Sequence, residues 1–581
     1  MRSNFLRFVV CAMVALFLGG AVALAQLESG QIAGTVLDPT GAVVTNAAVA
    51  VRNVDTNAER NTVSSSTGAF LLPGLTPGHY VVTVTSGSFK PYTAKVEVTV
   101  GGHVTLDVKL SLSSSVVQVQ VVAEGGVEVN TQTQELSQVI DTQQMQQLPS
   151  LTRNPYDFVG LSGNVSSGDN TTGSANSGQN LTNRGVGYAI NGQRESGTEI
   201  LLDGVENIAV FSEGVGEDVP VDAVQEYSVI TNNYSAEFGR ASGGVVNVTT
   251  KAGTNKFHGG VWEYNRLSAY TADTYGDDAA NWAAAQQDLP TSPKGKYTRN
   301  QYGFSVAGPV LKNKLFFEAT TEWTKVRSAA VETEEVFDPA FIALLPANAK
   351  AYFGAFGTGA APSSGVAATW GDLETTDFGN PQLNGVTQIP AATPVFDKVT
   401  FHAPYDAGGG VPQNTYALIG RADYNPTDKT QMFFRMGRES IVEQNGAAVY
   451  SAYPKDDVGD ASLNQSYLYS LSHTFSTSLF GSLKASFTRF NTANSFDTSL
   501  TYTPNLMFVS PVDLYTGGTI QMPGLENASS PGNGGLPYGG PQNTVQIEPD
   551  ISWTKGKHSL RFGGLYTYIQ MNAAYGAYIW I

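Results

Sequence analysis

The sequence predicts a mainly β protein whose C-terminal part is an antiparallel β-barrel that crosses a membrane. Its 581 residues include 62 Gly, 26 Tyr and 28 Phe but only 14% charged residues, which suits many turns and aromatic girdles. Residues 314–324 alternate, with Phe317 and Trp323 on one face and Glu318 and Glu322 on the other. The same split recurs at 301–306, 483–488 and 561–568. A strand between lipid and a polar lumen is expected to have two such faces.

The links between these strands favour a barrel over a soluble sandwich, whose strands would also alternate. We expect about nine strands, at 257–267, 298–308, 314–324, 415–425, 429–438, 462–475, 478–491, 545–554 and 558–570. Short links at 309–313, 426–428, 476–477 and 555–557 alternate with long links that are rich in Gly and Pro. Outer-membrane barrels have this asymmetry, with short periplasmic turns and long external loops.

The first 25 residues have the order of a secretory signal peptide. Arg2 and Arg7 precede an apolar run at 8–24, and small residues stand just before Gln26. A membrane anchor is the alternative, but the apolar run is short and is interrupted by two glycines. We therefore expect the mature chain to begin at Gln26.

Cleavage at that point would also remove Cys11, the only cysteine, so the mature chain would form no disulfide and no thiolate metal site. It would remove two arginines as well, which changes the formal net charge from -17 to 31 minus 50, or -19. We do not expect so acidic an envelope protein to bind nucleic acid. None of the six histidines belongs to a His-Glu-x-x-His motif, and no nucleophile elbow or phosphate-binding loop is present. The sequence thus predicts no enzyme, no metal site and no cofactor.

Residues 26–113 form the first predicted domain, a small β-sandwich. Short strands at 30–38, 47–54 and 81–85 are separated by turn sequences rich in Gly and Pro. The order of the Gly-x-Val-x-Asp turn and of the Pro-Gly-x-Tyr turn at 77–80 resembles the carboxypeptidase regulatory-like domain. That resemblance implies a structural module without a catalytic residue.

Residues 127–251 carry the most specific motifs of the chain. Ile-Asn-Gly-Gln-Arg at 190–194 precedes a strand and an Asp203-Gly204 turn, and Glu-Phe-Gly-Arg-Ala-Ser-Gly-Gly begins the run at 237–251. These residues resemble the plug of TonB-dependent outer-membrane receptors, in the Oar-like branch whose members carry a carboxypeptidase regulatory-like domain ahead of the plug. The resemblance implies an α+β plug inside the barrel. Helical spacing of apolar residues predicts a helix at 137–148.

Five charged residues of the predicted plug are candidates for anchoring it. A plug enclosed by a barrel has little bulk water nearby, so its charges should pair with one another or with the barrel wall. We expect Glu237 and Arg240 to anchor the plug to the wall, with Arg194, Asp203 and Glu226 as further candidates. The alternative is that all five are ordinary solvated surface charges.

The linker at 114–126 is a candidate for the energy-coupling segment, or Ton box. Its residues alternate between apolar and polar at 116–123, so the segment could pair along the edge of a sheet. In the resembled receptors the coupling segment lies ahead of the plug, which implies that Val117, Val119 and Val121 contact TonB. The alternative is that this stretch is the last strand of the sandwich or the first strand of the plug.

Residues 252–581 are expected to form only part of a barrel. The number of expected strands is odd, although a barrel whose chain enters and leaves on the periplasmic side needs an even number. A closed barrel of eight to ten strands has an interior nearly filled by side chains, so a plug of ~120 residues would need roughly twenty-two strands. We therefore expect this chain to be the N-terminal part of a longer, truncated receptor.

The predicted function is that of an outer-membrane receptor that takes up a ligand through a plugged barrel. Its implied partners are TonB, the lipid of the outer membrane and an unidentified ligand. Trp282 and Trp370 in the long loops could stack on a carbohydrate or a peptide, although aromatic residues also gather at membrane interfaces. The alternative function is that of an outer-membrane adhesin or structural envelope protein without energised transport.

Overall fold

The computed structural model describes most of the chain. The described residues are 29–87, 89–112, 120–121, 135–148, 150, 152–167, 188–210, 214–235, 237–273, 275–287, 291, 294–344, 350, 353–354, 363–374, 390–447, 450–453, 457–495, 538–555, 558–572 and 574–575. The predicted signal peptide and all of the predicted coupling segment except residues 120–121 lie outside them. No helix among the described residues is long and apolar enough to span a membrane.

The N-terminal domain consists of two packed sheets. One sheet joins β1 (Gly30–Leu37) to β4 (Ala69–Leu75), β7 (His103–Thr105) and β8 (Val108–Lys109). The other has the order β3 (Glu59–Val63), β2 (Ala48–Asn53), β5 (Gly78–Thr85), β6 (Tyr92–Val98) and β9 (Gln120–Val121). Alternate residues of both sheets meet in one apolar core that includes Ile32, Val51 and Val82, all of them inaccessible to solvent. This is the sandwich that the short strands predict.

The second domain is built on a mixed sheet of five strands. Its order is β10 (Leu136–Asp141), β17 (Val224–Asn232), β18 (Gly244–Thr250), β13 (Thr198–Leu202) and β14 (Val205–Glu206). The helix predicted at 137–148 is wrong in its first half, because residues 136–141 pair with β17 as a strand. Helix α2 spans only Thr142–Gln147, where Asp141 and Gln144 form a capping box that fixes its first turn.

Small paired strands and short helices complete this domain. The strands are β11 (Val165–Ser167) with β12 (Tyr188–Ile190) and β15 (Ile208–Ala209) with β16 (Gly214–Val215). The 3-10 helices are η1 (Pro155–Leu161), η4 (Glu195–Gly197) and η5 (Val221–Ala223). Tyr156 of η1 and Tyr227 of β17 meet edge to face at 6.1 Å between ring centroids, and both are buried in the core. The helices and the sheet therefore share one core.

The remaining strands form one long antiparallel sheet. Its path is β19 (His258–Leu267), β20 (Lys296–Leu311), β21 (Leu315–Phe337), β24 (Gln413–Thr427), β25 (Thr430–Glu443), β26 (Gly459–Ser476), β27 (Leu479–Ser495), β28 (Tyr538–Lys555) and β29 (His558–Gly563). Beside β28 lie β30 (Tyr566–Met571) and β31 (Ala574–Tyr575). The antiparallel strands predicted from alternation are confirmed, and the last of them is divided into β29 and β30 by Gly564 and Leu565.

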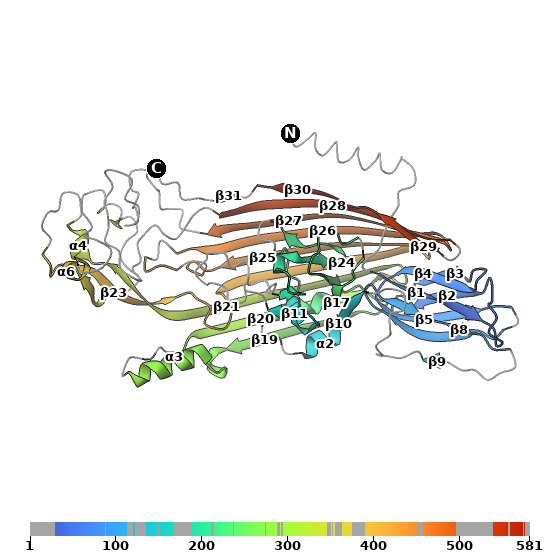
Figure 1. The fold of residues 1–581 in the computed structure, drawn as a ribbon, viewed down its shortest axis with the longest axis horizontal. Helices are drawn as coiled ribbons and strands as arrows, with labels where there is room; N and C mark the ends of the chain where they lie inside the picture. Colours follow the sequence, from blue (N-terminus) through green and yellow to red (C-terminus); the bar gives the residue numbers. More distant parts are fainter. Residues whose placement is uncertain are drawn as a thin grey trace.

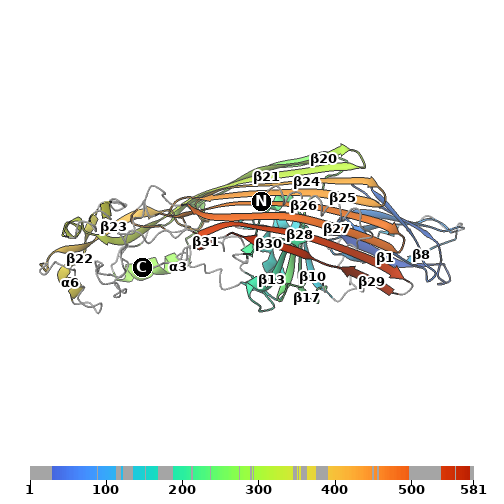
Figure 2. The same cartoon turned by 90° about the horizontal axis from the view of Figure 1, so that it is seen from above.

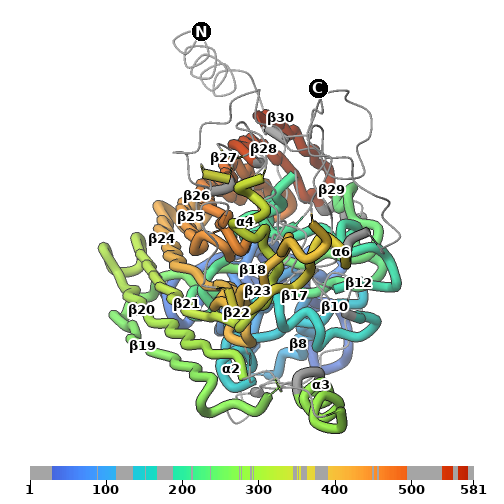
Figure 3. Tube along the Cα trace, turned by 90° about the vertical axis from the view of Figure 1, so that its left-hand side faces the viewer, coloured from blue at the N-terminus to red at the C-terminus, as the bar shows by residue number. Residues whose placement is uncertain are grey.

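Three views show how these parts are arranged. The long strands run side by side as a curved wall, with the sandwich at the end where the short turns lie (Figure 1). The strands of the plug lie across one face of this wall (Figure 2). Seen from the end, the plug occupies the concave side (Figure 3). We call the long sheet the barrel wall and the second domain the plug.

The two faces of the barrel wall differ as the sequence predicts. Phe304, Phe487 and Tyr568 point outward and are 45%, 37% and 45% exposed. Thr320 and Lys484 point toward the plug and are at most 1% exposed. The outward face is therefore apolar where lipid would contact it, and the polar face is covered by the plug.

One part of the fold was not expected from the sequence. Strand β21 continues well past 324 and pairs with β23 (Pro394–Ala403), which in turn pairs with β22 (Ser363–Thr369). Helices α4 (Pro339–Ile342) and α6 (Trp370–Glu374) pack against these strands, and the ring centroids of Phe337 and Phe396 lie 4.6 Å apart. The predicted loop around Gly365 therefore carries a small apolar core of its own, at the end of the wall opposite the sandwich (Figure 1). We call it the outer extension. The same end of the wall carries α3 (Tyr275–Gln286) and η6 (Ser268–Tyr270).

Candidate functional site

The contact between plug and barrel wall centres on Asp203, one of the predicted anchoring residues. Asp203 and Gly204 form the tight turn between β13 and β14, and both have positive φ angles, 51° and 72°. The carboxylate accepts hydrogen bonds from the backbone N–H of Thr250 at 2.8 Å and from its hydroxyl at 2.9 Å. Residue Asp203 is fully buried. The turn therefore directs a negative charge into the barrel wall.

Two arginines of the wall meet this carboxylate. Arg435 of β25 lies 2.9 Å from Asp203 and Arg421 of β24 lies 3.5 Å from it, and their side chains are 1% and 6% exposed. Arg421 also pairs with Asp423 at 2.9 Å and lies 4.0 Å above the ring of Phe433. Two positive and two negative charges are thus brought together, with Asp203 and both arginines nearly inaccessible to water and Asp423 partly exposed. We call the pairing of Asp203 with the two arginines the wall contact.

A second plug carboxylate continues the same network. Arg435 donates to the hydroxyl of Ser466 at 2.8 Å, and that hydroxyl donates to the carboxylate of Glu217. The Glu217 backbone is fixed by Asn207, which accepts from its N–H at 3.0 Å and donates to its carbonyl at 2.8 Å. Glu217 was not among the predicted site residues, because nothing in its neighbouring sequence distinguishes it from other loop acids.

Two further wall residues contact the β13–β14 hairpin, which carries Asp203 at its turn. Lys484, 1% exposed, donates to the backbone carbonyl of Gly204 at 3.2 Å and lies 3.7 Å from Glu548. Gln546 accepts from the backbone N–H of Glu206 at 3.1 Å and donates to its carboxylate at 3.0 Å. Wall strands β24, β25, β27 and β28 therefore all contact the β13–β14 hairpin.

The other predicted anchors lie in different surroundings. Glu237 pairs with Arg561 of β29 at 2.9 Å, in a partly exposed position that we call the rim contact. Arg240 pairs within the plug, with Glu206. Arg194 is exposed at the start of η4. Only Asp203 and Glu237 of these residues therefore pair directly with charged side chains of the wall.

Glu226 turns away from the wall and toward the sandwich. Its carboxylate accepts a hydrogen bond from the backbone N–H of Val100 at 2.7 Å. Burial raises the pKa of Glu226 to about 7, and the neighbouring Glu97 and Asp141 add to the rise while the Val100 N–H opposes it. Asn57 of the sandwich also donates to Asn313 in the first short turn of the wall, at 3.2 Å. The sandwich thus contacts both plug and wall.

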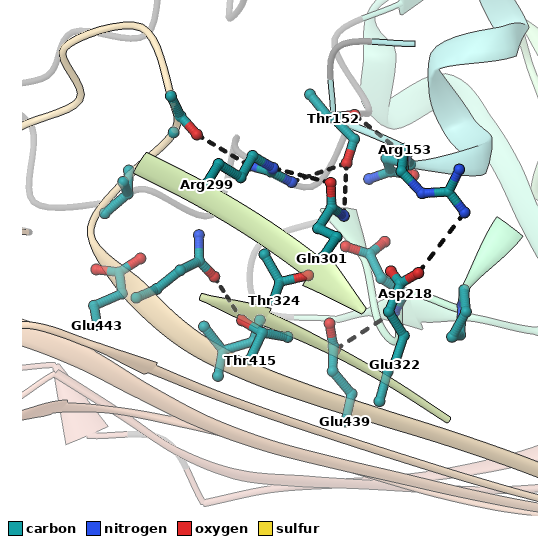
Figure 4. Close-up of a pocket in the computed structure, with 18 of the residues that line it drawn as sticks. Thr152, Arg153, Asp218, Arg299, Gln301, Glu322, Thr324, Thr415, Glu439 and Glu443 are labelled. Atoms are coloured by element: carbon teal, nitrogen blue, oxygen red, sulfur yellow. Dashed lines mark hydrogen bonds and ion pairs between the residues drawn. The ribbon is translucent and has the colours of Figure 1, made fainter. Parts of the chain in front are cut away.

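An open cavity of about 340 Å³ lies between the plug and the wall on the side of the long loops. The plug contributes Thr152, Arg153 and Asp218, and the wall contributes residues of β19 to β21 and β24 to β27 (Figure 4). Arg153 pairs with Asp222 at 2.5 Å and its guanidinium lies 3.7 Å from the ring centroid of Tyr264. The cavity floor is therefore made by the plug and its sides by the wall.

Comparison of the sequence with known protein families shows which family the barrel wall belongs to. A model described as an outer membrane beta barrel domain matches residues 249–578, and a carboxypeptidase regulatory-like domain matches residues 31–111. The first match covers more than half of the chain. The chain belongs to this outer-membrane β-barrel family. Its location in the outer membrane and its resemblance to Oar-like TonB-dependent receptors, both predicted from the sequence, are thereby confirmed.

Two curated proteins are similar to this outer-membrane β-barrel protein. The TonB-dependent transporter Oar of Myxococcus xanthus is 26% identical over 52% of the chain and 27% of its own length. A probable TonB-dependent siderophore receptor, PirA of Acinetobacter baumannii, is 28% identical over 28% of the chain and 20% of its own length. Among solved structures, the Escherichia coli outer membrane transporter YddB is 13% identical, with a TM-score of 0.45 over 74% of this chain and 48% of that one. The matched segments span less than a third of the two curated relatives.

Two predictions about sites in this outer-membrane β-barrel protein remain to be placed. Of the predicted TonB contacts, Val117 and Val119 lie outside the described residues. Val121 belongs to β9, whose backbone pairs in parallel with Ala94 and Lys95 of β6. Within the described part of the chain, no group of three or more His, Cys, Asp or Glu side chains is placed to hold a metal ion.

Proposed function

We propose that this protein is a TonB-dependent receptor that takes up a ligand through a plugged barrel and catalyses no reaction. The observation that carries the proposal is the wall contact, in which Asp203 of the plug lies between Arg421 and Arg435 of the wall. A domain that only occludes the barrel and never moves could be held there by apolar packing alone. A charged, hydrogen-bonded contact can separate into hydrated parts, because water can replace each hydrogen bond once the contact opens.

Under this proposal the wall contact keeps the barrel closed and its opening admits the ligand. Plug anchoring is assigned to Asp203 and Glu237, with Lys484 and Gln546 of the wall holding the same hairpin as Asp203. The free energy needed to separate buried charges would come from TonB, which would act on the segment ahead of the plug. Residues 116–123 are the proposed coupling segment, and their alternation suits the addition of a strand to a sheet of TonB once β9 has separated from β6.

A proline variant of this segment tests the proposal. Proline lacks a backbone N–H, so Val119→Pro should prevent strand pairing with TonB and abolish uptake of the ligand. Val119→Ala keeps the N–H and serves as the matched control. Surface binding and membrane assembly should be the same in both variants. Uptake by Val119→Pro at the rate of Val119→Ala would contradict energy coupling through this segment.

The outer extension supports a second candidate, an adhesin that does not transport. Its buried rings of Phe337, Phe341 and Phe396 make a folded platform beyond the wall, where surface binding would take place. An adhesin needs no TonB. Binding of cells or matrix that persists in Val119→Pro, together with an absence of energised uptake in the unaltered protein, would favour this candidate.

A further inference from the structure

The cavity above the plug holds two cross-strand pairs of like charge. On one side, Arg266 of β19 stands directly opposite Arg299 of β20, and both side chains line the cavity. Like charges directly opposite each other on neighbouring strands destabilise a sheet. Arg299 donates to the carbonyl oxygens of Thr152 and Gly409, at 2.8 and 3.2 Å. The guanidinium is thereby held in place at the cavity wall. Asp406, whose carboxylate accepts from the backbone N–H groups of Gly408 and Gly410, also lines the cavity on this side and offsets part of the positive charge.

The other side of the cavity has the opposite charge. In the register of β25 and β26, Val442 is opposite Ala461, which places Glu443 opposite Asp460 at the next position. Both residues line the cavity and are 8% and 7% exposed. Glu439, on the same face of β25, accepts from Asn464 at 2.8 Å and adds a third carboxylate.

Mostly uncharged groups lie between these two sides, with Asp218 of the plug on the cavity floor. Strands β21 and β24 contribute Thr324, Gln413 and Thr415 to the lining between them. Glu322 lies in the same region, 3.8 Å from Arg153, which also pairs with Asp222 at 2.5 Å. The three strand spacings from β20 to β25 amount to roughly 14 Å along the wall. Side chains that reach inward from both sides shorten the span that a ligand would have to bridge.

We propose that this cavity binds an unbranched zwitterion, with an ammonium group at Glu443 and Asp460 and a carboxylate at Arg266 and Arg299. This inference rests on the proposed function as a receptor and names the class of its ligand. An extended chain of about three amino acids spans roughly 10 Å between its ends, which matches the separation of the two charged sides. A short peptide therefore fits the site.

The rest of the lining agrees with a peptide. A cavity of about 340 Å³ has the volume of a small ligand site. No aromatic side chain is among the described residues that line it, so a planar aromatic ligand would find no ring on which to stack. Thr324, Gln413 and Thr415 instead offer hydrogen-bonding groups to the peptide backbone.

Binding of labelled trialanine to outer-membrane vesicles that contain the protein tests this inference. N-acetyl-trialanine and trialanine amide should each bind about tenfold more weakly, because each lacks one charge-assisted interaction. Glu443→Gln should weaken the binding of trialanine by about the same factor. It should leave the binding of the acetylated peptide unchanged, because that peptide has no ammonium group to pair with Glu443. Glu263→Gln, on the outward face of β19, is the matched control and should bind all three peptides normally.

The outcomes distinguish this inference from the proposed function. Failure of trialanine to bind, or equal binding of all three peptides, would overturn the assignment of a zwitterion. A loss of acetyl-peptide binding in Glu443→Gln as large as that of trialanine would also overturn it, because the effect would then be structural. Peptide binding needs no energy, so it would survive in Val119→Pro even if uptake stopped. Energised uptake of some other solute without peptide binding would overturn this inference alone.

Discussion

The wall contact and the rim contact both join a plug carboxylate to arginine of the wall, but their surroundings differ. At the wall contact the side chains of Asp203 and Arg435 are 0% and 1% exposed. At the rim contact those of Glu237 and Arg561 are 21% and 40% exposed. Water screens the second pair and not the first. The same chemical pairing therefore has two different consequences for the stability of the plug.

The difference follows from the cost of leaving a charge unpaired. Removing one partner of a buried ion pair destabilises a protein by ~3 to 5 kcal/mol, because the other charge stays out of water. An exposed pair contributes ~0 to 1 kcal/mol, since either charge can be hydrated by itself. The wall contact should thus determine whether the plug stays bound to the wall. Loss of the rim contact should change the stability of the bound plug only slightly.

The largest effect is expected for Asp203→Ala. The change removes the carboxylate that pairs with Arg421 and Arg435 and the acceptor for Thr250. We therefore expect the plug to be bound to the wall less stably by ~3 to 5 kcal/mol. Hydrogen exchange of the β13–β14 hairpin measures this loss directly. Asp203→Asn is the matched variant, because it keeps an acceptor for Thr250 and removes only the charge. Unchanged exchange in both variants would show that the hairpin is held by packing.

A smaller effect is expected for Lys484→Met. Methionine keeps the length of the side chain but cannot donate to the Gly204 carbonyl, which would be left buried without that bond. An unsatisfied buried acceptor costs ~1 to 3 kcal/mol. Urea titration of plug release, followed by protease accessibility, should show an effect between those of the wall and rim variants. An effect as large as that of Asp203→Ala would mean that the hairpin backbone, and not its charge, is the main anchor.

The sequence predicted the barrel wall better than it predicted these contacts, for a physical reason. Alternation along a strand is a local property, and the length of each link is visible in the sequence, so the antiparallel strands were predicted correctly. The partners of Asp203 are more than 200 residues away on β24 and β25, and no local pattern distinguishes Arg421 from any other inward-facing arginine. A buried pair is created by the fold and is not visible in either segment.

Two other predictions show what else local patterns miss. The stretch 137–148 has helical spacing, but its first residues pair with β17 as a strand, and tertiary contacts outweigh propensity. Arg240, three residues after Glu237, was also expected to anchor the plug to the wall, yet it pairs with Glu206 inside the plug. Nearness in sequence therefore did not imply the same side of the plug.

The pH dependence of Glu226 extends the comparison to the contact between sandwich and plug. Docking raises the pKa of this carboxyl to about 7 from an ordinary value near 4.5, so the docked state binds a proton more readily than the separated state. Docking should therefore be strongest at low pH and weaken as pH rises toward 7, by at most about tenfold for each pH unit.

A disulfide measures this equilibrium without disturbing Glu226. Asn57→Cys with Asn313→Cys places one thiol on each side of the contact between sandwich and wall, and the predicted mature chain has no other cysteine. The fraction that crosslinks on brief oxidation should fall from pH 5 to pH 7 after correction for thiol ionisation. The same pair with Glu226→Gln should lose that dependence. A pH dependence that remained in Glu226→Gln would assign the effect to Glu97 or Asp141 instead.

The smallest effect is expected for Glu237→Gln at the rim contact. Arg561 would keep Asp550 at 3.6 Å and is open to water, so loss of the Glu237 charge should cost ~0 to 1 kcal/mol. Added salt should shrink even this difference, whereas it should leave the effect of Asp203→Asn nearly unchanged, because screening reaches only charges that water reaches. Plug release in urea at low and high salt, for both variants, measures the two responses. Equal salt sensitivity would mean that water enters the wall contact, and the distinction between the two contacts would no longer hold.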